Sequence, residues 1–358
     1  MANHKPIISL KRCPHHMPSG WNPPVPAYSA DLHADTQITV LYLGVQRPTD
    51  AALRAVNAMF AKTDTVSLEF AEFTDRAGDV NRAYIAYFQG ADAFSDWCGA
   101  SNFDAFLSDD KHLNASYGLW TEIYAFQRGQ FETLFSTPDS LEGVGQLASK
   151  TVGPIREHSY WGGTEDRIPN FKPGNFDARL AKMPAPKVAK TRGRRIKVQA
   201  PDNFCLIRSG QDLRAMKALE RDEYDAEIEP ALREGLAYLA DNAASGCFES
   251  RYMQHCSQNG VLIEKTFGMQ LFLSIKHLLD WAKSHPTHLK IFKNFQTMAL
   301  GMQGQIDLRL WHEIAVIAGK DIRAEYINCN AMTGLLPFTH VLSHHQSTDN
   351  SLQAQETR

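Results

Sequence analysis

The sequence lacks several features that would identify common classes of protein. It has no run of about 18 apolar residues, so it contains no candidate for a membrane-spanning helix. It has no CxxC or HExxH motif, and therefore no familiar zinc-site spacing. The N-terminal segment has no extended hydrophobic region or cleavage site of a secretory signal. The six cysteines are scattered without paired motifs, which favours reduced thiols in the cytoplasm: Cys13, Cys98, Cys205, Cys247, Cys256 and Cys329.

An excess of charge of one sign is also missing. The chain has 37 Lys and Arg residues against 40 Asp and Glu residues, a formal net charge of −3. This balance gives no electrostatic case for nucleic acid or a membrane surface as a partner. What is present is an ordinary globular composition, 43% apolar over 358 residues. Such a chain can bury a large core, as one domain or as two fused halves.

Periodicity divides the chain into two halves of strands and helices. Residues 1–35, rich in Pro and His, are expected to form an irregular arm. In the first half, residues 36–168, we predict strands at 37–46, 81–88 and 119–126 and helices at 50–61 and from 91–97. In the second half, residues 198–343, we predict strands at 203–208, 261–270, 308–317 and 322–329 and helices at 211–242 and 271–283.

The segment between the halves, Pro169–Lys197, has a different composition. It contains nine Lys and Arg residues, one acidic residue, Asp177, and several prolines. We predict a long basic connecting loop on the surface, whose charges are solvated or contact an anionic group. Residues 344–358 are polar and aperiodic, and we expect a disordered tail.

A weak internal repeat supports two related halves. The strand Tyr84–Phe88 leads into a helix ending in Asp96-Trp97, and the strand Leu262–Gln270 leads into a helix ending in Asp280-Trp281. Each half has the approximate order of a ferredoxin-like unit. We therefore expect an α+β fold in which two fused ferredoxin-like halves form an open antiparallel β-barrel-like core surrounded by helices.

Two histidines lie within apolar patterns in the stretch from Ser284 to Glu313. From His288, apolar residues recur at helical spacing through Phe292, Phe295 and Met298, and Pro286 is typical of a first helical turn. His312 lies in a strand-like alternation from Leu308 to Val316. Both imidazoles are thus expected to be buried, which requires a hydrogen-bond partner or a metal. Either residue taken alone is more often a hydrogen-bonded core histidine than a ligand.

Four blocks of sequence resemble a known family. They are HPTHLKIF from His285, LRLWHE from Leu308, EHSYWGGTEDRIP from Glu157 and APDNFCLIRSGQD from Ala200. In their order along the chain they resemble the haem-containing aldoxime dehydratases, and the likeness extends from about Tyr42 to Pro337. The resemblance implies the fold expected above, a homodimer, and haem b that is ferrous in the active state. It also implies the reaction R–CH=N–OH to R–C≡N plus water.

The resemblance assigns roles to six residues. His288 falls on the proximal ligand of the haem iron, and His285, which precedes the helix, is the poorer candidate. His312 falls on the general acid that then acts as a base. Ser209 falls on a serine that hydrogen-bonds the oxime hydroxyl, and Arg167 on a distal arginine that orients the oxime oxygen. Glu132 falls on a carboxylate that holds the arginine and histidine, and His158 on a pocket histidine of unspecified role.

The residues alone leave other interpretations open. Ser209 with Asp212 resembles a helix-capping box, Arg167 fits a surface loop, and Cys13-Pro14 fits either a thiolate haem ligand or an exposed tail cysteine. The chain departs from the family at Thr164-Glu165, where the family has Met-Arg, so the charge beside Arg167 differs. The competing functions are a haem peroxidase or chlorite-dismutase-like enzyme, a haem carrier or sensor, and a ferredoxin-like protein without haem.

Overall fold

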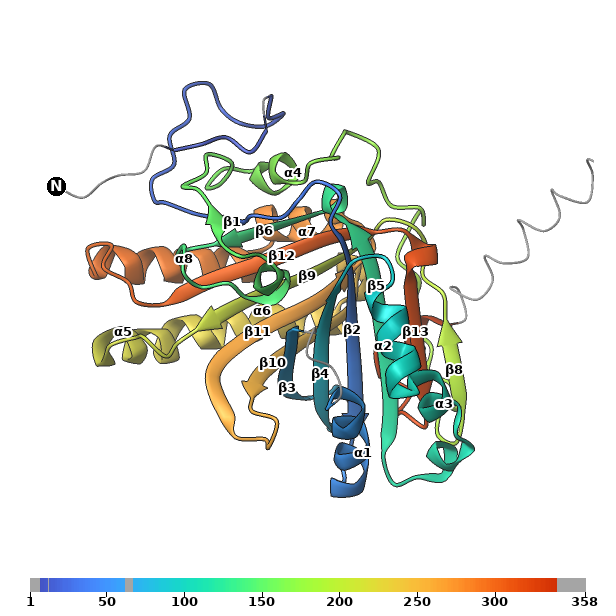
Figure 1. Ribbon diagram of the computed structural model, residues 1–358. Helices are drawn as coiled ribbons and strands as arrows, with labels where there is room; N and C mark the ends of the chain where they lie inside the picture. The colour runs from blue at the N-terminus through green and yellow to red at the C-terminus, as the bar shows by residue number, and fades with distance from the viewer. Residues whose placement is uncertain (1–6, 12, 62–66, 340–358) are drawn as a thin grey trace, which may run out of the picture.

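The computed structural model describes residues 7–11, 13–61 and 67–339, and its centre is one eleven-stranded antiparallel sheet (Figure 1). The strands lie in the order β6-β12-β9-β11-β10-β3-β4-β2-β5-β13-β8. The terminal strands, β6 and β8, do not pair with each other in this part of the chain. The predicted α+β fold with a large antiparallel sheet is therefore confirmed, and the sheet is open. Separately, β1 (Ser29–Ala30) and β7 (Thr151–Val152) pair as a two-stranded antiparallel sheet.

The same local order of strands occurs in both halves. The first half contains β2 (Gln37–Gln46), α1 (Asp50–Phe60), β3 (Ser67–Thr74), β4 (Val80–Gln89), α2 (Ala93–Ser101) and β5 (Gly118–Gln127), with a short α3 (Phe103–Ser108) after α2. Its strands lie in the order β3-β4-β2-β5. Numbered along the half, this is 2-3-1-4.

The second half contains β9 (Phe204–Asp212), α5 (Ala218–Glu223), α6 (Glu229–Asp241), β10 (Cys247–Cys256), β11 (Leu262–Phe272), α7 (Ile275–Ser284), α8 (Pro286–Gly301) and β12 (Arg309–Ile317). Its strands lie in the order β12-β9-β11-β10, or 4-1-3-2, which is the order of the first half in reverse. The halves join where β3 pairs with β10. The strands β6 (Phe131–Phe135), β13 (Ile322–Ile327) and β8 (Arg195–Val198) extend the two ends.

Alternation along the strands separates an inner core from the helix layers. On β2, Val40 and Tyr42 belong to a cluster that both halves share, with Trp120, Phe267 and Trp311. The intervening Leu41, Leu43 and Val45 pack instead against α1, α2 and α3. In the second half the helices α6 and α7 cover the corresponding outer face. Figure 1 shows α5 to α8 beside the second-half strands and α2 and α3 beside β5 and β13.

A second internal repeat, which the sequence analysis missed, lies in the fourth strand of each half. Residues 119–122 of β5 are Leu-Trp-Thr-Glu, and residues 310–313 of β12 are Leu-Trp-His-Glu. Each tryptophan lies opposite a glycine on the first strand of its own half, Trp120 opposite Gly44 and Trp311 opposite Gly210. The indoles fill the space that a side chain would need, because a Cβ on Gly44 would lie 1.9 Å from Trp120 Cε2. The earlier Asp-Trp echo falls on α2 and α7, the helices that follow the third strand of each half.

The predicted helix over residues 211–242 is wrong at its start. β9 continues to Asp212, because it is hydrogen-bonded to β11 on one side and to β12 on the other along its length. The helical part begins at Ala218 and is interrupted by a π-helical segment, Tyr224–Ile228. The interpretation of Ser209 as a helix cap is therefore also wrong, because Ser209 lies inside a central strand.

Four strands of the large sheet were not predicted, namely β3, β6, β8 and β10. The basic connection from Pro169 to Lys197 is irregular and mostly exposed, but its last residues, Arg195–Lys197, belong to β8. The expected tail at 344–358 lies outside the described residues. No helix in the described ranges is long and apolar enough to span a membrane.

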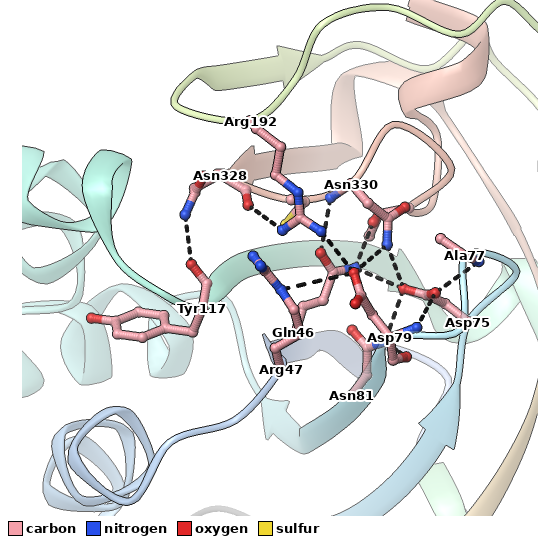
Figure 2. Close-up of polar contacts among 12 residues, drawn as sticks. Gln46, Arg47, Asp75, Ala77, Asp79, Asn81, Tyr117, Arg192, Asn328 and Asn330 are labelled. Carbon is pink, nitrogen blue, oxygen red and sulfur yellow. Dashed lines mark hydrogen bonds and ion pairs between the residues drawn. The ribbon is translucent and has the colours of Figure 1, made fainter.

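Polar side chains anchor the connection and the C-terminal segment to the first half (Figure 2). Asp75 and Asp79, at the turn between β3 and β4, both accept hydrogen bonds from the Asn330 amide at 2.9 Å. Arg192 donates to Asp79 at 2.8 Å and to the Asn328 carbonyl at 3.0 Å. These contacts hold together chain segments that are distant in sequence, at the turn between β3 and β4.

We predict that Gly44→Ala and Gly210→Ala each destabilise the protein by about 1–3 kcal/mol, because the new methyl group overlaps an indole ring. Denaturant unfolding at neutral pH measures the change. Gly99→Ala in α2 is the matched control, since nothing lies within 4 Å of its Cβ position, and it should be neutral or slightly stabilising. Equal stabilities for all three variants would refute the predicted packing.

Candidate functional site

Ser209 and His312 form one rung of the pairing between β9 and β12. They are direct partners in the antiparallel register, so both side chains point to the same face of the sheet. Leu134 of β6 lies on the other side of His312. The hydroxyl of Ser209 makes no hydrogen bond to any residue that the structure describes. The pairing thus places a free hydroxyl beside an imidazole, and brings together two of the residues to which the resemblance assigned roles.

The face that carries this rung is the one covered by helices. Two residues along β12 from His312, Ile314 packs into the cluster formed with α6 and α7. Two residues in the other direction, Leu310 packs into a cluster with Met298 of α8. His312 therefore lies on the strand between residues of two apolar clusters, and its side chain is 24% exposed. The prediction that it lies on an apolar strand face is confirmed, but the expected burial of its imidazole is only partial.

Glu132 and Arg167 meet at His312. Arg167 Nε donates to Glu132 Oε2 at 2.6 Å, and its Nη2 donates to Glu132 Oε1 at 3.1 Å, a two-point contact. His312 Nε2 lies 2.9 Å from Glu132 Oε1 and 3.1 Å from Arg167 Nη2. The Glu132 and Arg167 side chains are almost fully buried, so Arg167 is not the surface-loop residue that its local sequence permits.

Two further contacts fix the guanidinium. Arg167 ends the short helix α4 (Gly163–Arg167), and its Nη1 donates to the carbonyl oxygen of Glu157 at 2.6 Å. Its Nη2 also donates to the hydroxyl of Thr164 at 3.2 Å. Thr164 is one of the two positions where the chain departs from the family pattern. The sequence analysis did not identify Thr164 or the Glu157 carbonyl as partners of Arg167.

The environment of Glu132 sets its charge. Burial opposes its ionisation, but the positive charge of Arg167, the adjacent His312 and their hydrogen bonds outweigh it and lower the pKa of Glu132 to about 2. The carboxylate is therefore ionised at neutral pH and compensates the buried guanidinium. An anion placed here can hold both neighbours in fixed orientations, the role that the resemblance implied for Glu132.

His158 lies near this group without joining it. Its Nδ1 contacts the hydroxyl of Ser159 at 2.9 Å, and its buried Nε2 has no hydrogen-bond partner among the described residues. Burial, together with the charge of Arg167, lowers the pKa of His158 to about 4. The imidazole is thus neutral at pH 7 and adds no charge beside Arg167.

His288 occupies the first turn of α8, as the helical spacing and Pro286 predicted. Its ring lies 4.8 Å from that of Trp281, and burial lowers the pKa of His288, which favours the neutral imidazole. The predicted buried stripe along α8 is partly wrong, because Met298 is buried but Phe292 is 47% exposed. His285 caps α8, with its Nδ1 accepting from the Thr287 backbone.

The surroundings of His288 fit a haem group. Its Nδ1 is buried and makes no direct hydrogen bond in the described part of the chain, although a contact of the imidazole with the Ala282 backbone opposes the lowering of its pKa. An imidazole with an unpaired nitrogen can bind a metal. A neutral imidazole is the protonation state that a metal ligand requires. The partly exposed Phe292 supplies the apolar surface that a porphyrin needs. Trp281, whose ring contacts that of His288, packs into one of the two clusters that flank His312, and Phe295 of α8 packs into the other. Cys13 is exposed.

The opposite face of the same two strands carries a buried ionic group that the sequence analysis missed. Arg208 and Glu313, the neighbours of Ser209 and His312, form the adjacent rung. Arg208 is fully buried, 2.7 Å from Glu69 and 3.8 Å from Glu313, with its guanidinium 4.1 Å from the centre of the Phe267 ring. Strand alternation could have indicated this, because residues beside an outward-facing pair must face inward.

Taken together, the site holds a free hydroxyl, an imidazole and a fixed guanidinium over a buried carboxylate. Such a group can bind a small polar molecule and exchange a proton with it.

Comparison with known proteins identifies the family. The family model described as haem-containing dehydratase matches residues 41–335. The chain belongs to this family. It is 33% identical over 344 residues to an aliphatic aldoxime dehydratase of Pseudomonas chlororaphis, covering 91% of this chain and 95% of the relative. It is 31% identical over 340 residues to a phenylacetaldoxime dehydratase of Bacillus sp. (strain OxB-1), with the same coverage of both chains.

Solved structures agree with the family match. An aldoxime dehydratase crystallised with butyraldoxime superposes with a TM-score of 0.81 at 32% identity, covering 90% of this chain and 93% of that one. The resemblance inferred from the four sequence blocks is therefore confirmed. The chain is homologous to aldoxime dehydratases, which are lyases, and its family implies a haem cofactor.

We predict that Glu132→Gln weakens the pH dependence of stability between pH 4.5 and pH 2. The native carboxylate has a lowered pKa, so its stabilisation is fully present above the ordinary value of 4.5 and is lost as the pH falls toward 2. The variant should also lose about 3–5 kcal/mol at pH 7, because it leaves the Arg167 charge buried without its partner.

Denaturant unfolding across this pH range measures both effects. The matched control is Glu264→Gln, whose native side chain is 62% exposed and should contribute little. Identical pH profiles for the two variants would show that Glu132 is not a buried, ionised partner.

Proposed function

We propose that this protein converts aldoximes to nitriles, R–CH=N–OH to R–C≡N plus water, with haem as its cofactor. The observation that carries the proposal is the meeting of His312, Arg167 and Glu132 beside the free hydroxyl of Ser209. Membership of the haem-containing dehydratase family and the butyraldoxime complex of a homologue support the substrate class. Aliphatic and arylalkyl aldoximes are both candidates, because relatives of both names match the chain.

We assign the haem iron to His288. The buried Nδ1 without a partner, the neutral imidazole and the half-exposed Phe292 on the same helix support this assignment. Haem b bound there, with ferrous iron in the active state, would supply an electron-rich Lewis acid for the oxime nitrogen. A histidine on α8 would leave the side chains on β9 and β12 free for the rest of the substrate.

Ser209 and Arg167 orient the oxime oxygen in this proposal. The Ser209 hydroxyl is free to donate a hydrogen bond to it. Arg167, held by Glu132 and by the Glu157 carbonyl, presents a fixed positive charge that stabilises negative charge on the leaving oxygen. The guanidinium needs little reorganisation, because its five contacts are already made in the protein.

His312 carries the proton in both directions. It first protonates the oxime oxygen, so that the N–O bond breaks and water leaves. It then removes the hydrogen from the oxime carbon, whose bonding electrons form the second π bond of the nitrile. The proton released from carbon restores the starting state of His312, and no electron is gained or lost overall. Glu132 positions both His312 and Arg167. The neutral His158 lines the site without adding charge.

We further propose that the chain consists of two fused ferredoxin-like halves, residues 36–168 and 198–343, joined by the connection 169–197. The shared strand order and the paired Leu-Trp-x-Glu segments support this division. A homodimer is proposed from the family resemblance. The six unpaired cysteines support a reducing, cytoplasmic location.

The proposal predicts nitrile formation from butyraldoxime and phenylacetaldoxime by the anaerobic, dithionite-reduced protein. Ferrous iron favours a nitrogen donor, so the reduced form should act much faster than the oxidised form. Gas chromatography of the nitrile and the visible haem spectrum are the two measurements. A haem-containing protein that turns over peroxide but forms no nitrile from either aldoxime would overturn the proposal.

Separate variants test the two histidines. His312→Ala should keep the haem spectrum and lower nitrile formation by at least about a hundredfold, because the proton carrier is lost. His288→Ala should lose haem itself.

The control for the second variant is His285→Ala, three residues earlier, which removes the α8 cap but should keep haem. Full haem content with a histidine-type spectrum in His288→Ala would exclude this ligand, and normal turnover in His312→Ala would exclude that acid–base assignment.

A further inference from the structure

The N-terminal residues 8–11 and 13–21, here called the arm, lie against residues 154–168, here called the distal loop, which carries Arg167. Ile8 pairs with Ile155: its N–H donates to the Pro154 carbonyl at 2.8 Å, and its carbonyl accepts from Arg156 N at 2.9 Å. Figure 1 shows this first part of the chain beside α4 at the top of the view. The arm is distant from the site in sequence but contiguous with it in space.

Two buried carboxylates of the distal loop hold the arm. Glu157 Oε1 accepts hydrogen bonds from the backbone of Leu10 at 2.9 Å and of Lys11 at 3.3 Å, and from the hydroxyl of Ser9. Asp166 accepts from the backbone N–H groups of His15 at 2.6 Å and His16 at 3.0 Å. Both acids are almost fully buried, so these amides stabilise groups that would otherwise be costly to bury. Glu157 Oε2 has no hydrogen-bond partner among the described residues, so the arm supplies the hydrogen bonds of Oε1 alone.

The same two residues are connected directly to Arg167. The carbonyl oxygen of Glu157 accepts from Arg167 Nη1 at 2.6 Å, while its side chain binds the arm. Asp166 precedes Arg167 in α4 and also accepts from the Tyr160 hydroxyl at 2.9 Å. Both carboxylates therefore bind the arm, while Glu157 contacts the guanidinium of Arg167 through its carbonyl and Asp166 is its neighbour in α4.

The remaining contacts close the arm over the distal loop. His16 packs on Gly162, where a Cβ would lie 2.4 Å from that of His16 and φ is +100°. His16 Nε2 lies 3.1 Å from Glu165 Oε2. Trp21 Nε1 donates to the carbonyl of His158 at 3.1 Å, and Arg156 donates to the Trp21 carbonyl at 2.7 Å. Glu165, at a position where the chain departs from the family pattern, thus has a partner on the arm.

We propose that the arm is a clamp that positions Arg167 through Glu157 and Asp166. The inference rests on the proposed function, because Arg167 matters as a positioned group only if it orients the substrate. The arm amides fix the two carboxylates, the carboxylates fix the distal loop, and the loop fixes the guanidinium. Releasing the arm should therefore misplace Arg167 without removing any group that contacts the substrate or haem.

The matched pair His15→Pro and His15→Ala tests this clamp. Both variants remove an exposed imidazole, but only proline removes the N–H that donates to Asp166. Amide hydrogen exchange in the holoprotein, followed at His16, Asp166 and Ile168, should accelerate about tenfold in His15→Pro and stay unchanged in His15→Ala. Leu10→Pro with Leu10→Ala repeats the test at Glu157 and covers the case in which one proline variant does not fold.

Kinetics then connect the clamp to Arg167. His15→Pro should lower kcat about tenfold while the haem content and spectrum stay constant, because small displacements of an orienting group are costly. In an Arg167→Lys background the same change should have little further effect, since the group that the arm positions is already altered.

Three results would overturn the clamp. The first is unchanged amide exchange at Asp166 and Ile168 in both proline variants. The second is an equal loss of kcat in the alanine controls. The third is a loss of kcat in His15→Pro that is as large in the Arg167→Lys background as in the wild type. The exchange measurement does not depend on turnover. A wild-type protein that forms no nitrile would therefore contradict the proposed function, while exchange at α4 would still decide whether the arm holds the distal loop.

Discussion

The pairing of β9 with β12 is the constraint on which the site depends. Two adjacent rungs of this pairing carry polar pairs that face opposite sides, Ser209 with His312 toward the helices and Arg208 with Glu313 toward the inner core. A slip of one residue would exchange the faces, exposing the inner ions to the helix layer and burying the imidazole in the core. The register therefore cannot change without losing both pairs, and the site inherits the rigidity of the sheet.

The inner pair explains why this register is strongly specified. Arg208 is fully buried, and its charge is compensated by Glu69 at 2.7 Å, while Tyr87 bridges to Glu313 with a hydrogen bond of 2.6 Å. A buried cation without these partners would be very costly, so alternative pairings of the strands are disfavoured. Glu313 is held further by the backbone N–H of Val144 at 2.6 Å. The inner network thus fixes the position of His312 from the opposite face.

Local sequence predicted the elements whose pattern is local, and it failed where the deciding contacts are distant. The spacing around His288 and the alternation around His312 placed α8 and β12 correctly. The same reasoning assigned Ser209 to a helix cap, because Ser-x-x-Asp is a local signal, whereas the two neighbouring strands that keep β9 extended to Asp212 come from elsewhere in the chain. Likewise, nothing near Arg167 predicts its contact with Glu132, 35 residues earlier. Only the family resemblance brought these residues together before the structure did.

Comparing the two copies of the internal repeat separates the residues that both halves share from the residues found only at the site. Both halves place a tryptophan over a strand glycine and a buried glutamate two residues later, paired with an arginine: Glu122 with Arg251 and Glu313 with Arg208. At the position of His312 the first half has Thr121, and opposite it, at the position of Ser209, it has Leu43. The shared framework therefore does not require the polar outward pair. The polar outward pair lies on only one copy of the repeated strand pairing. The inner ion pairs also differ, because Arg208 lies directly opposite Glu313, whereas Tyr42 lies opposite Glu122 and Arg251 comes from β10.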